Sequence, residues 1–136
     1  MVEKNKTDVK GNDEALTSLA DFSDGDKVNV RRIGRVTKTF KDNKSGVVKT
    51  IEVLILDTNK GLVSVNGGDI VNGEVDSSTG TVAYRQILNW VERNNFIIPI
   101  KAMDEQWTVA KIKTGTFTYV SIEELANTFD VSHAFD

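Results

Sequence analysis

The clearest pattern in the chain is an alternation of apolar and polar residues over positions 27–40. The apolar residues at even positions are Val28, Val30, Val36 and Phe40. The odd positions are polar, with Ile33 as the exception. A period of two places the two sets on opposite faces of one long β-strand. Gly34 in its middle predicts a bulge or bend, which a small closed barrel requires of its first strand.

Two further strands are expected after this one. Residues 47–56 are apolar enough to form a central strand, which pairs with the first across the polar turn 41–46. A short third strand is expected at 62–65. Residues 66–78 are rich in Gly, Asn, Asp and Ser, and this composition predicts a long loop.

The hydrophobic period then changes from strand-like to helical. The apolar residues at helical spacing are Val82, Ala83, Ile87, Trp90 and Val91. They predict a helix over residues 81–94. Thr79 or Thr81 is a suitable N-cap, and the pair Asn94-Asn95 can end the helix.

Strands are expected again after the helix. Residues 96–103 read as a strand, at an edge or bulged because Pro99 lacks a backbone donor. Residues 107–113 and 116–120 read as a hairpin across Thr114-Gly115.

Short helices are expected near both ends. The N-terminal one would have Asn12 or Asp13 as its N-cap, and its apolar stripe would be Ala15, Leu16, Leu19 and Ala20. The C-terminal one would begin at Ser121 as N-cap, with Glu124 at the capping-box position.

This order of elements predicts a mainly β fold. Three strands, a helix and two or three further strands suit an OB-fold, a five-stranded barrel with one helix between strands three and four. Other small α+β domains share the order. The expected organisation is a flexible acidic N-terminal segment at 1–25, an OB-like binding domain at 26–121, and an acidic C-terminal helix and tail at 122–136.

The length and composition of the chain limit its domain number and its cellular compartment. The 136 residues amount to about one domain. The chain contains no cysteine, which excludes disulfides and thiolate metal sites and fits a reducing compartment. The N-terminus is polar and no apolar run reaches membrane length, so we expect a cytoplasmic protein without a membrane partner.

Charge is distributed unevenly beneath a net value of −3. Residues 27–49 contain one acid, Asp42, and eight basic residues: Lys27, Arg31, Arg32, Arg35, Lys38, Lys41, Lys44 and Lys49. Both ends of the chain are acidic. A basic middle between acidic ends is typical of proteins that hold a polyanion, and a solvated mixed-charge face is the alternative.

No set of residues indicates catalysis, a metal or a cofactor. The single histidine, His133, lies near the C-terminus, where a catalytic geometry is hard to hold. The acids Asp21, Asp24 and Asp26, and a second group at 69–76, do not match a calcium loop and read as turn residues. Gly67-Gly68 lacks a phosphate-loop motif and reads as a flexible hairpin loop. We therefore do not expect an enzyme.

Basic and aromatic residues form the strongest constellation. Arg31 and Arg35 would share the polar face of the first strand, about 13 Å apart. Lysines continue the charge to the hairpin tip, and aromatic rings would stack on bases. The candidate nucleic-acid-binding residues are Arg31, Arg32, Arg35, Lys38, Lys41, Lys44, Lys49, Trp107, Lys111, Lys113, Phe117 and Tyr119. Phe40 and Trp90 read as core residues, whereas Trp107 is the best exposed aromatic candidate.

Four segments carry a family resemblance. They are Asp24-Gly25 before a long polar strand, GVVKTIEVLILD as the next strand, GTVAYRQILNWVERNNF as a helix running into a strand, and the closing strand TFTYVSI. Over about residues 22–122, the chain resembles the single-stranded DNA-binding proteins of small bacteriophages that replicate by protein priming. The resemblance implies an OB-like fold, cooperative coating of single strands during replication, and no cofactor. Such proteins stack bases on Tyr or Trp, and no specific stacking position carries over to this chain.

The leading expectation is therefore a sequence-tolerant protein that binds single-stranded DNA and protects it during phage DNA replication, in the host cytoplasm. The alternative is a protein-interaction or regulatory module acting on a host or replication protein. A structural particle component is a third possibility. The acidic C-terminal tail, which mixes acids with Phe129 and Phe135, is a candidate contact for replication proteins. Self-association into a homo-oligomer is left open.

Overall fold

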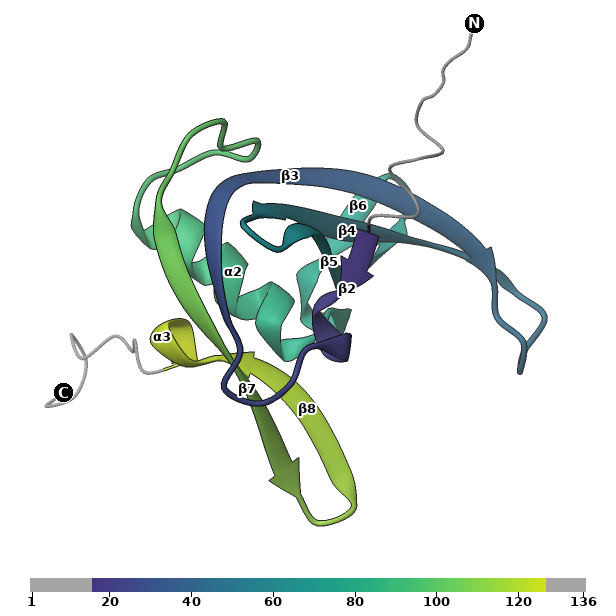
Figure 1. Ribbon diagram of the computed structural model, residues 1–136. Coiled ribbons are helices and arrows are strands. Elements are labelled where there is room, and N and C mark those ends of the chain that lie inside the picture. Colours follow the sequence, from purple (N-terminus) through teal and green to yellow (C-terminus); the bar gives the residue numbers. More distant parts are fainter. Residues whose placement is uncertain (1–15, 127–136) are drawn as a thin grey trace, which may run out of the picture.

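The computed structural model describes residues 16–126, which fold mainly as β-structure in one curled sheet resembling half of a barrel (Figure 1). The strands are β2 (Leu16–Ser18), β3 (Lys27–Lys41), β4 (Val48–Thr58), β5 (Gly61–Val71), β6 (Glu74–Asp76), β7 (Glu105–Thr114) and β8 (Phe117–Ile122). The helical elements are η1 (Leu19–Asp21), η2 (Ser77–Thr79), α2 (Val82–Arg93) and α3 (Glu123–Ala126). The strand order is β2-β5-β4-β3-β7-β8, with β6 paired to β5.

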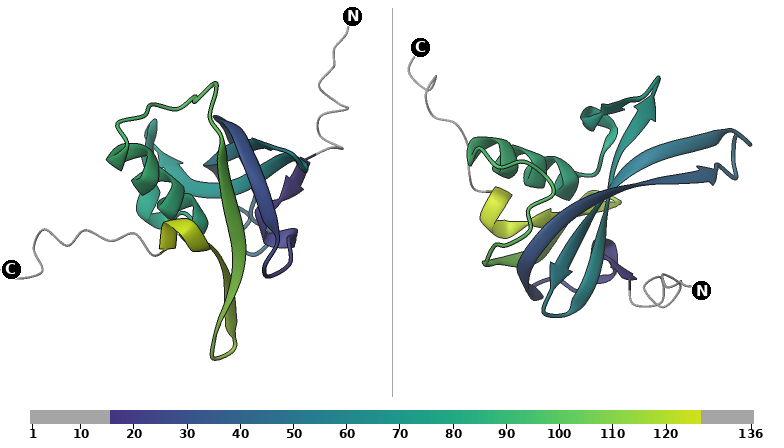
Figure 2. Two further views of the ribbon diagram at one scale, coloured as in Figure 1. Left: turned by 60° about the vertical axis from the view of Figure 1, so that its left-hand side comes forward. Right: turned by 90° about the horizontal axis from the view of Figure 1, so that it is seen from above.

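The long strand β3 links the two halves of the sheet. Its first residues, Lys27–Val30, pair with β7, and most of the rest pairs antiparallel with β4 (Figure 2). β4 continues to β5, whose outer edge receives β2 in parallel. The mainly β character expected from the alternating pattern is confirmed.

A bulge in β3 reverses the faces of its alternation. Val30 lies opposite Thr58 and Arg32 lies opposite Asp57, so Arg31 is an extra residue. An extra residue shifts a period-two pattern by one position. Val30 therefore points into the core before the bulge, as do Val28 earlier and Ile33 beyond it.

Two expectations for this strand are corrected by that bulge. The irregularity lies at Arg31 rather than at Gly34. Beyond it, the even positions face away from the core, because Arg35 lies opposite the buried Leu54. Phe40, expected in the core, is 38% exposed, and Val36 is 50% exposed.

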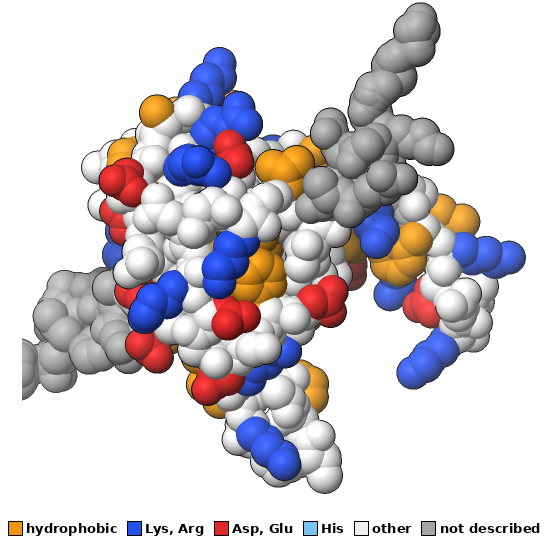
Figure 3. Space-filling model, in the orientation of Figure 1, with side chains coloured by type: hydrophobic (Ala, Val, Ile, Leu, Met, Phe, Trp, Pro, Cys, Tyr) orange, Lys and Arg blue, Asp and Glu red, His pale blue; other side chains and the backbone are white. Residues whose placement is uncertain are grey.

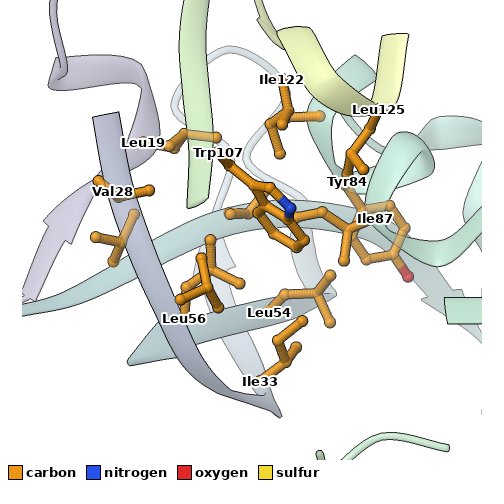
Figure 4. Close-up of a cluster of buried hydrophobic side chains, with 14 of the residues drawn as sticks. Leu19, Val28, Ile33, Leu54, Leu56, Tyr84, Ile87, Trp107, Ile122 and Leu125 are labelled. Carbon is orange, nitrogen blue, oxygen red and sulfur yellow. The ribbon is translucent and has the colours of Figure 1, made fainter. Parts of the chain in front are cut away.

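Helix α2 covers the inner face of the sheet, within the residue range expected for a helix. Thr81 is its N-cap and accepts a hydrogen bond from the backbone N–H of Tyr84. The buried face of the helix consists of Ala83, Tyr84, Ile87 and Val91. These side chains meet residues of β3, β4, β5, β7 and β8 in one core cluster (Figure 4).

Trp107 belongs to this core, so its expected exposure is wrong. It is 1% exposed, and its ring packs edge-on against Trp90 with centroids 5.4 Å apart. Register explains the burial, because Trp107 lies opposite the inward-facing Val28 and shares its face. Figure 4 shows the indole among Leu19, Ile87 and Ile122.

The loop expected at 66–78 is mostly strand. β5 runs to Val71 and turns through Asn72-Gly73 into β6. A Cβ atom on Gly67 would collide with the ring of Tyr84, and one on Gly68 would collide with the backbone of Asp76. Gly67 permits close packing of β5 against α2 and Gly68 permits close approach to β6, and neither forms a flexible hairpin loop.

Three smaller expectations also differ from the structure. Leu16–Ser18 is a strand, followed by the single turn η1, where an α-helix was expected. Residues 96–103 make only one isolated bridge, Ile33 to Ile100, instead of a strand. α3 begins at Glu123, because Ser121 belongs to β8 and accepts a hydrogen bond from the side chain of Gln86.

The expected roles of residues 1–15 and of the acidic tail at 127–136 lie outside the described residues. Within residues 16–126, no helix is both long and apolar enough to cross a membrane.

Candidate nucleic-acid interface

The far part of the β3–β4 hairpin, residues 36–50, projects from the body of the protein and is called the arm below (Figures 1 and 2). It holds one acid, Asp42, and four lysines: Lys38, Lys41, Lys44 and Lys49. Its exposed apolar residues are Val36, Phe40, Val47 and Val48. In Figure 3 the arm shows basic side chains beside hydrophobic ones. Four of the eight basic residues predicted as a stretch at 27–49 therefore lie on a protrusion that also exposes apolar surface.

Most of the exposed basic and apolar side chains of this region lie on one face of β3. Directly opposite residues in an antiparallel pair share a face. Phe40 lies opposite Lys49, and Arg32 lies opposite Asp57, all on the face turned away from the core. Pro99 and Lys101 continue this face on the other side of β3, where Ile100 bridges to Ile33. We call this set the outer strip: Arg32, Gly34, Val36, Lys38, Phe40, Lys49, Pro99 and Lys101.

Gly34 forms the floor of a hollow at the centre of this region. The hollow has a volume of about 390 Å³, and Ile55, Pro99, Arg32 and Lys101 contribute to its walls. A Cβ atom on Gly34 would meet nothing within 4 Å. The glycine is therefore not required by packing, and its lack of a side chain leaves space between two cations.

The three arginines of β3 do not share one face. Arg32 pairs with Asp57 on the outer strip, with Nε and Oδ2 2.7 Å apart. Arg31, at the bulge, donates to the backbone carbonyl of Thr58 at 2.7 Å. Arg35 points to the other face, where its guanidinium lies 3.3 Å from the Glu52 carboxylate. The expected groove with Arg31 and Arg35 on one face is wrong, because the alternation changes face at the bulge residue Arg31.

The lysine side chains of the arm make fewer close contacts with acids than the arginines of β3 do. The Nζ atom of Lys38 lies 5.9 Å from the centroid of the Phe40 ring, within cation–π distance. Lys49 approaches Asp42 at 3.8 Å. The backbone N–H of Lys44 donates to the Asp42 carboxylate and holds the pKa of that group below its ordinary value. The side chains of Lys41 and Lys44 contact no acid among residues 16–126.

The remaining predicted residues lie on a second hairpin, β7–β8, which projects in another direction (Figure 1). Phe117 is 64% exposed, and its ring stacks on that of Tyr119 with centroids 6.2 Å apart. Lys111 is occupied, because its Nζ donates to the carbonyl of Ala20 at 2.7 Å. Lys113 is exposed near the turn. The predicted set is therefore divided between two hairpins.

A buried polar contact anchors the base of the arm and was missed in the sequence. The Tyr84 hydroxyl of α2 donates to Glu52 Oε1 at 2.5 Å, and Arg35 approaches the other carboxylate oxygen. Burial, together with the hydrogen bond and charge of Glu52, raises the pKa of Tyr84 to about 12. The available signal was a glutamate set in the apolar run from Ile51 to Leu56.

The acids of the two clusters accept hydrogen bonds from backbone and side-chain groups, one of them from a distant strand. Asp24 accepts the backbone N–H of Lys111, and Asp26 accepts that of Ser23. Asp76 caps η2. Within residues 16–126, no three His, Asp or Glu side chains are grouped closely enough to hold a metal ion. No protein-family model, curated protein or solved structure matches this chain.

Proposed function

We propose that the protein binds single-stranded DNA without strong sequence preference, along the outer strip. The observation that carries this proposal is the alignment of cations and an exposed aromatic ring on one extended face. Arg32 and Lys101 flank a hollow at one end, and Lys38, Phe40 and Lys49 lie at the other. Phosphates would contact the cations, while unpaired bases would contact Phe40 and Val36.

The dimensions of the strip suit a single strand. Eight residue steps separate Arg32 from Phe40, about 26 Å at the usual rise of a strand. OB-folds bind about 4–16 nucleotides each. We further propose that this domain is an OB-fold, since the order β5-β4-β3-β7-β8, with α2 between β6 and β7 in the chain, is compatible with that barrel.

The chemistry favours single strands over duplex. Stacking requires the flat face of a base, which a duplex conceals, and each stack contributes about 1–3 kcal/mol whatever the base. Lysines contact phosphates as point charges and read no sequence. Four cations on the strip predict a salt slope of about −3, from roughly 0.7 per phosphate neutralised on a single strand.

The test is fluorescence anisotropy of a labelled oligo-dT, titrated with the full chain at two salt concentrations. We expect binding that weakens with salt and that falls about tenfold or more in Lys38→Glu/Lys49→Glu, by loss of two phosphate contacts. Lys60→Glu is the control for charge reversal away from the strip: it reverses one lysine, against two in the double variant, in the β4–β5 turn at the opposite end of β4 from the arm. Equal affinity in both variants would refute the outer strip as the site. Tighter binding to duplex or to RNA would refute the assigned ligand.

A protein-interaction module is the second candidate, and the exposed apolar residues of the arm favour it. Val36 and Phe40 lie on one face of the arm and Val48 on the other. Apolar side chains on both faces of a protruding hairpin are suited to contact a partner protein. The test is a pull-down after nuclease treatment. This function is supported if the wild-type chain captures one protein partner and Val36→Asp/Val48→Asp does not.

A further inference from the structure

A pocket of about 410 Å³ lies away from the outer strip, between η1, β5, the start of α2 and β8. Its volume lies within the range of about 300–1,000 Å³ that is usual for small-molecule sites. Apolar side chains such as Leu19 and Val82 line it, together with polar groups of Asn66 and Thr81. The pocket occupies the seam of the half-barrel, where β5 and β8 do not pair with each other.

One wall of the pocket is aromatic. Phe117 and Tyr119 both line it, and their rings stack with an angle of 30° between planes. Phe117 stays 64% exposed although it is large and apolar. β8 pairs with β7 on one side and with no strand among residues 16–126 on the other. Backbone groups on this unpaired edge are therefore within reach of the edge of a planar ring that stacks on Phe117.

One cation reaches the pocket. Arg85, on the first turns of α2, lines it, and its Nε donates to the carbonyl of Gly80 at 3.3 Å. That bond uses one donor of a guanidinium that has five. Within residues 16–126, no acid pairs with Arg85. The guanidinium can therefore bind an anionic group at the pocket.

We propose that this pocket binds one nucleotide, with its base stacked on Phe117 and its phosphate paired with Arg85. A stacking surface beside a cation selects a planar ring that carries an anion, which is the chemistry of a nucleotide. The choice of ligand rests on the proposed function, but the site is separate from the outer strip. The nucleotide is either free or part of a bound single strand.

The experiment follows NMR amide shifts of the full chain during titration with thymidine monophosphate, thymidine and oligo-dT. We expect saturable shifts near Asn66, Thr81 and Phe117 with the monophosphate or with oligo-dT. Shifts with the monophosphate assign a free nucleotide, whereas shifts with oligo-dT alone assign a nucleotide within a strand. Absence of saturable shifts at the pocket with all three ligands would overturn the proposal.

Two variants separate stacking from charge. Phe117→Ala should weaken pocket binding about tenfold, the usual effect of losing one base–aromatic stack. Arg85→Gln should weaken binding of the phosphorylated ligands and leave thymidine unchanged. The controls are Phe40→Ala, an exposed aromatic on the arm, read with the monophosphate alone because Phe40 belongs to the outer strip, and Lys60→Gln, a cation in the β4–β5 turn. Pocket binding that survives both Phe117→Ala and Arg85→Gln would refute the proposal.

The pocket proposal and the outer-strip proposal can be refuted independently of each other. Lys38→Glu/Lys49→Glu should weaken oligo-dT binding and leave the pocket shifts with the monophosphate in place. If those shifts persist while Lys38→Glu/Lys49→Glu binds oligo-dT as tightly as the wild type does, the pocket proposal is supported and the outer-strip proposal is refuted. If Lys38→Glu/Lys49→Glu weakens oligo-dT binding while the pocket residues show no saturable shifts with any ligand, only the pocket proposal is refuted.

Discussion

The hydroxyl of Tyr84 donates a hydrogen bond to the carboxylate of Glu52, and this contact joins helix α2 to the base of the arm. Both side chains are buried, and Arg35 supplies the compensating charge from the edge of the site. The contact occurs where the sheet stops being covered and the arm begins. It is therefore well placed to hold the direction in which the arm projects.

Removing the hydroxyl should destabilise the protein. Tyr84→Phe leaves a buried carboxylate oxygen without its donor, which costs about 1–3 kcal/mol. Urea unfolding followed by circular dichroism measures the loss. Tyr119→Phe is the matched control, since Tyr119 is half-exposed and should show little change. Equal stabilities for the two variants would show that the Tyr84–Glu52 bond contributes nothing.

The same tyrosine predicts a loss of stability in alkali. Its pKa is raised from the ordinary 10.0 to about 12, so the folded state holds the proton more tightly than the unfolded state. The contribution is complete below pH 10.0 and is lost as the pH rises toward about 12. Unfolding midpoints measured across this window should fall less steeply in Tyr84→Phe than in the wild type. Parallel curves would contradict the prediction.

Glu124 should lose its stabilising contribution at low pH, the opposite end of the pH range from Tyr84. Its burial favours a higher pKa, but hydrogen bonds from the Thr108 hydroxyl and N–H, with the charge of Lys27, outweigh burial and lower the pKa below 4.5. The carboxylate therefore stabilises the fold above pH 4.5 and stops doing so as the pH falls through its folded pKa. Glu124→Gln should be less stable than the wild type at neutral pH, and the difference should shrink in acid. Glu123→Gln, exposed on the same helix turn, should show no such difference.

Two glycines should respond oppositely to alanine. Gly67→Ala places a methyl group against the ring of Tyr84 and the carbonyl of Glu52, so we expect a loss of at least about 2 kcal/mol. Gly34→Ala meets open space, and should be neutral or stabilising by about 0.4–1 kcal/mol through the unfolded state. Urea midpoints of the two variants decide the point. A tolerated Gly67→Ala would mean that β5 and α2 do not pack as closely as described.

Trp107 carries a buried indole N–H that has no hydrogen-bond partner among residues 16–126. Trp107→Phe removes this unsatisfied donor together with some packing volume, so its cost should be well below the roughly 3–5 kcal/mol expected for Trp107→Ala. Thermal unfolding of the two variants measures the difference. Equal losses in the two variants would contradict the prediction.

Much of the local structure could be predicted from the pattern of residues. Alternation with period two located β3 and β4 within two residues at each end, since half-buried strands require it. Helical spacing and Thr81 located α2. The basic character of the arm was also visible, because neighbours in a hairpin are neighbours in sequence.

The composition of the candidate site could not be predicted in the same way. One extra residue at Arg31 exchanges the faces of β3, and the only sign of it was that Ile33 broke the alternation. That exchange turned Arg35 toward Glu52 and brought Phe40 to the outer strip. Ladder pairing between distant strands decides where a bulge lies, and a local pattern does not report it.

The sequence by itself determined the strands β3 and β4, the helix α2 and where positive charge gathers, because periodicity, capping and charge are local properties. The tertiary structure alone decided that Trp107 is core, that Gly67 and Gly68 are packed strand residues, and that Phe117 and Arg85 line one pocket. Each of these depends on contacts between residues far apart in the chain. Such contacts follow from strand register and from the close packing of α2 on the sheet, and no single segment encodes them.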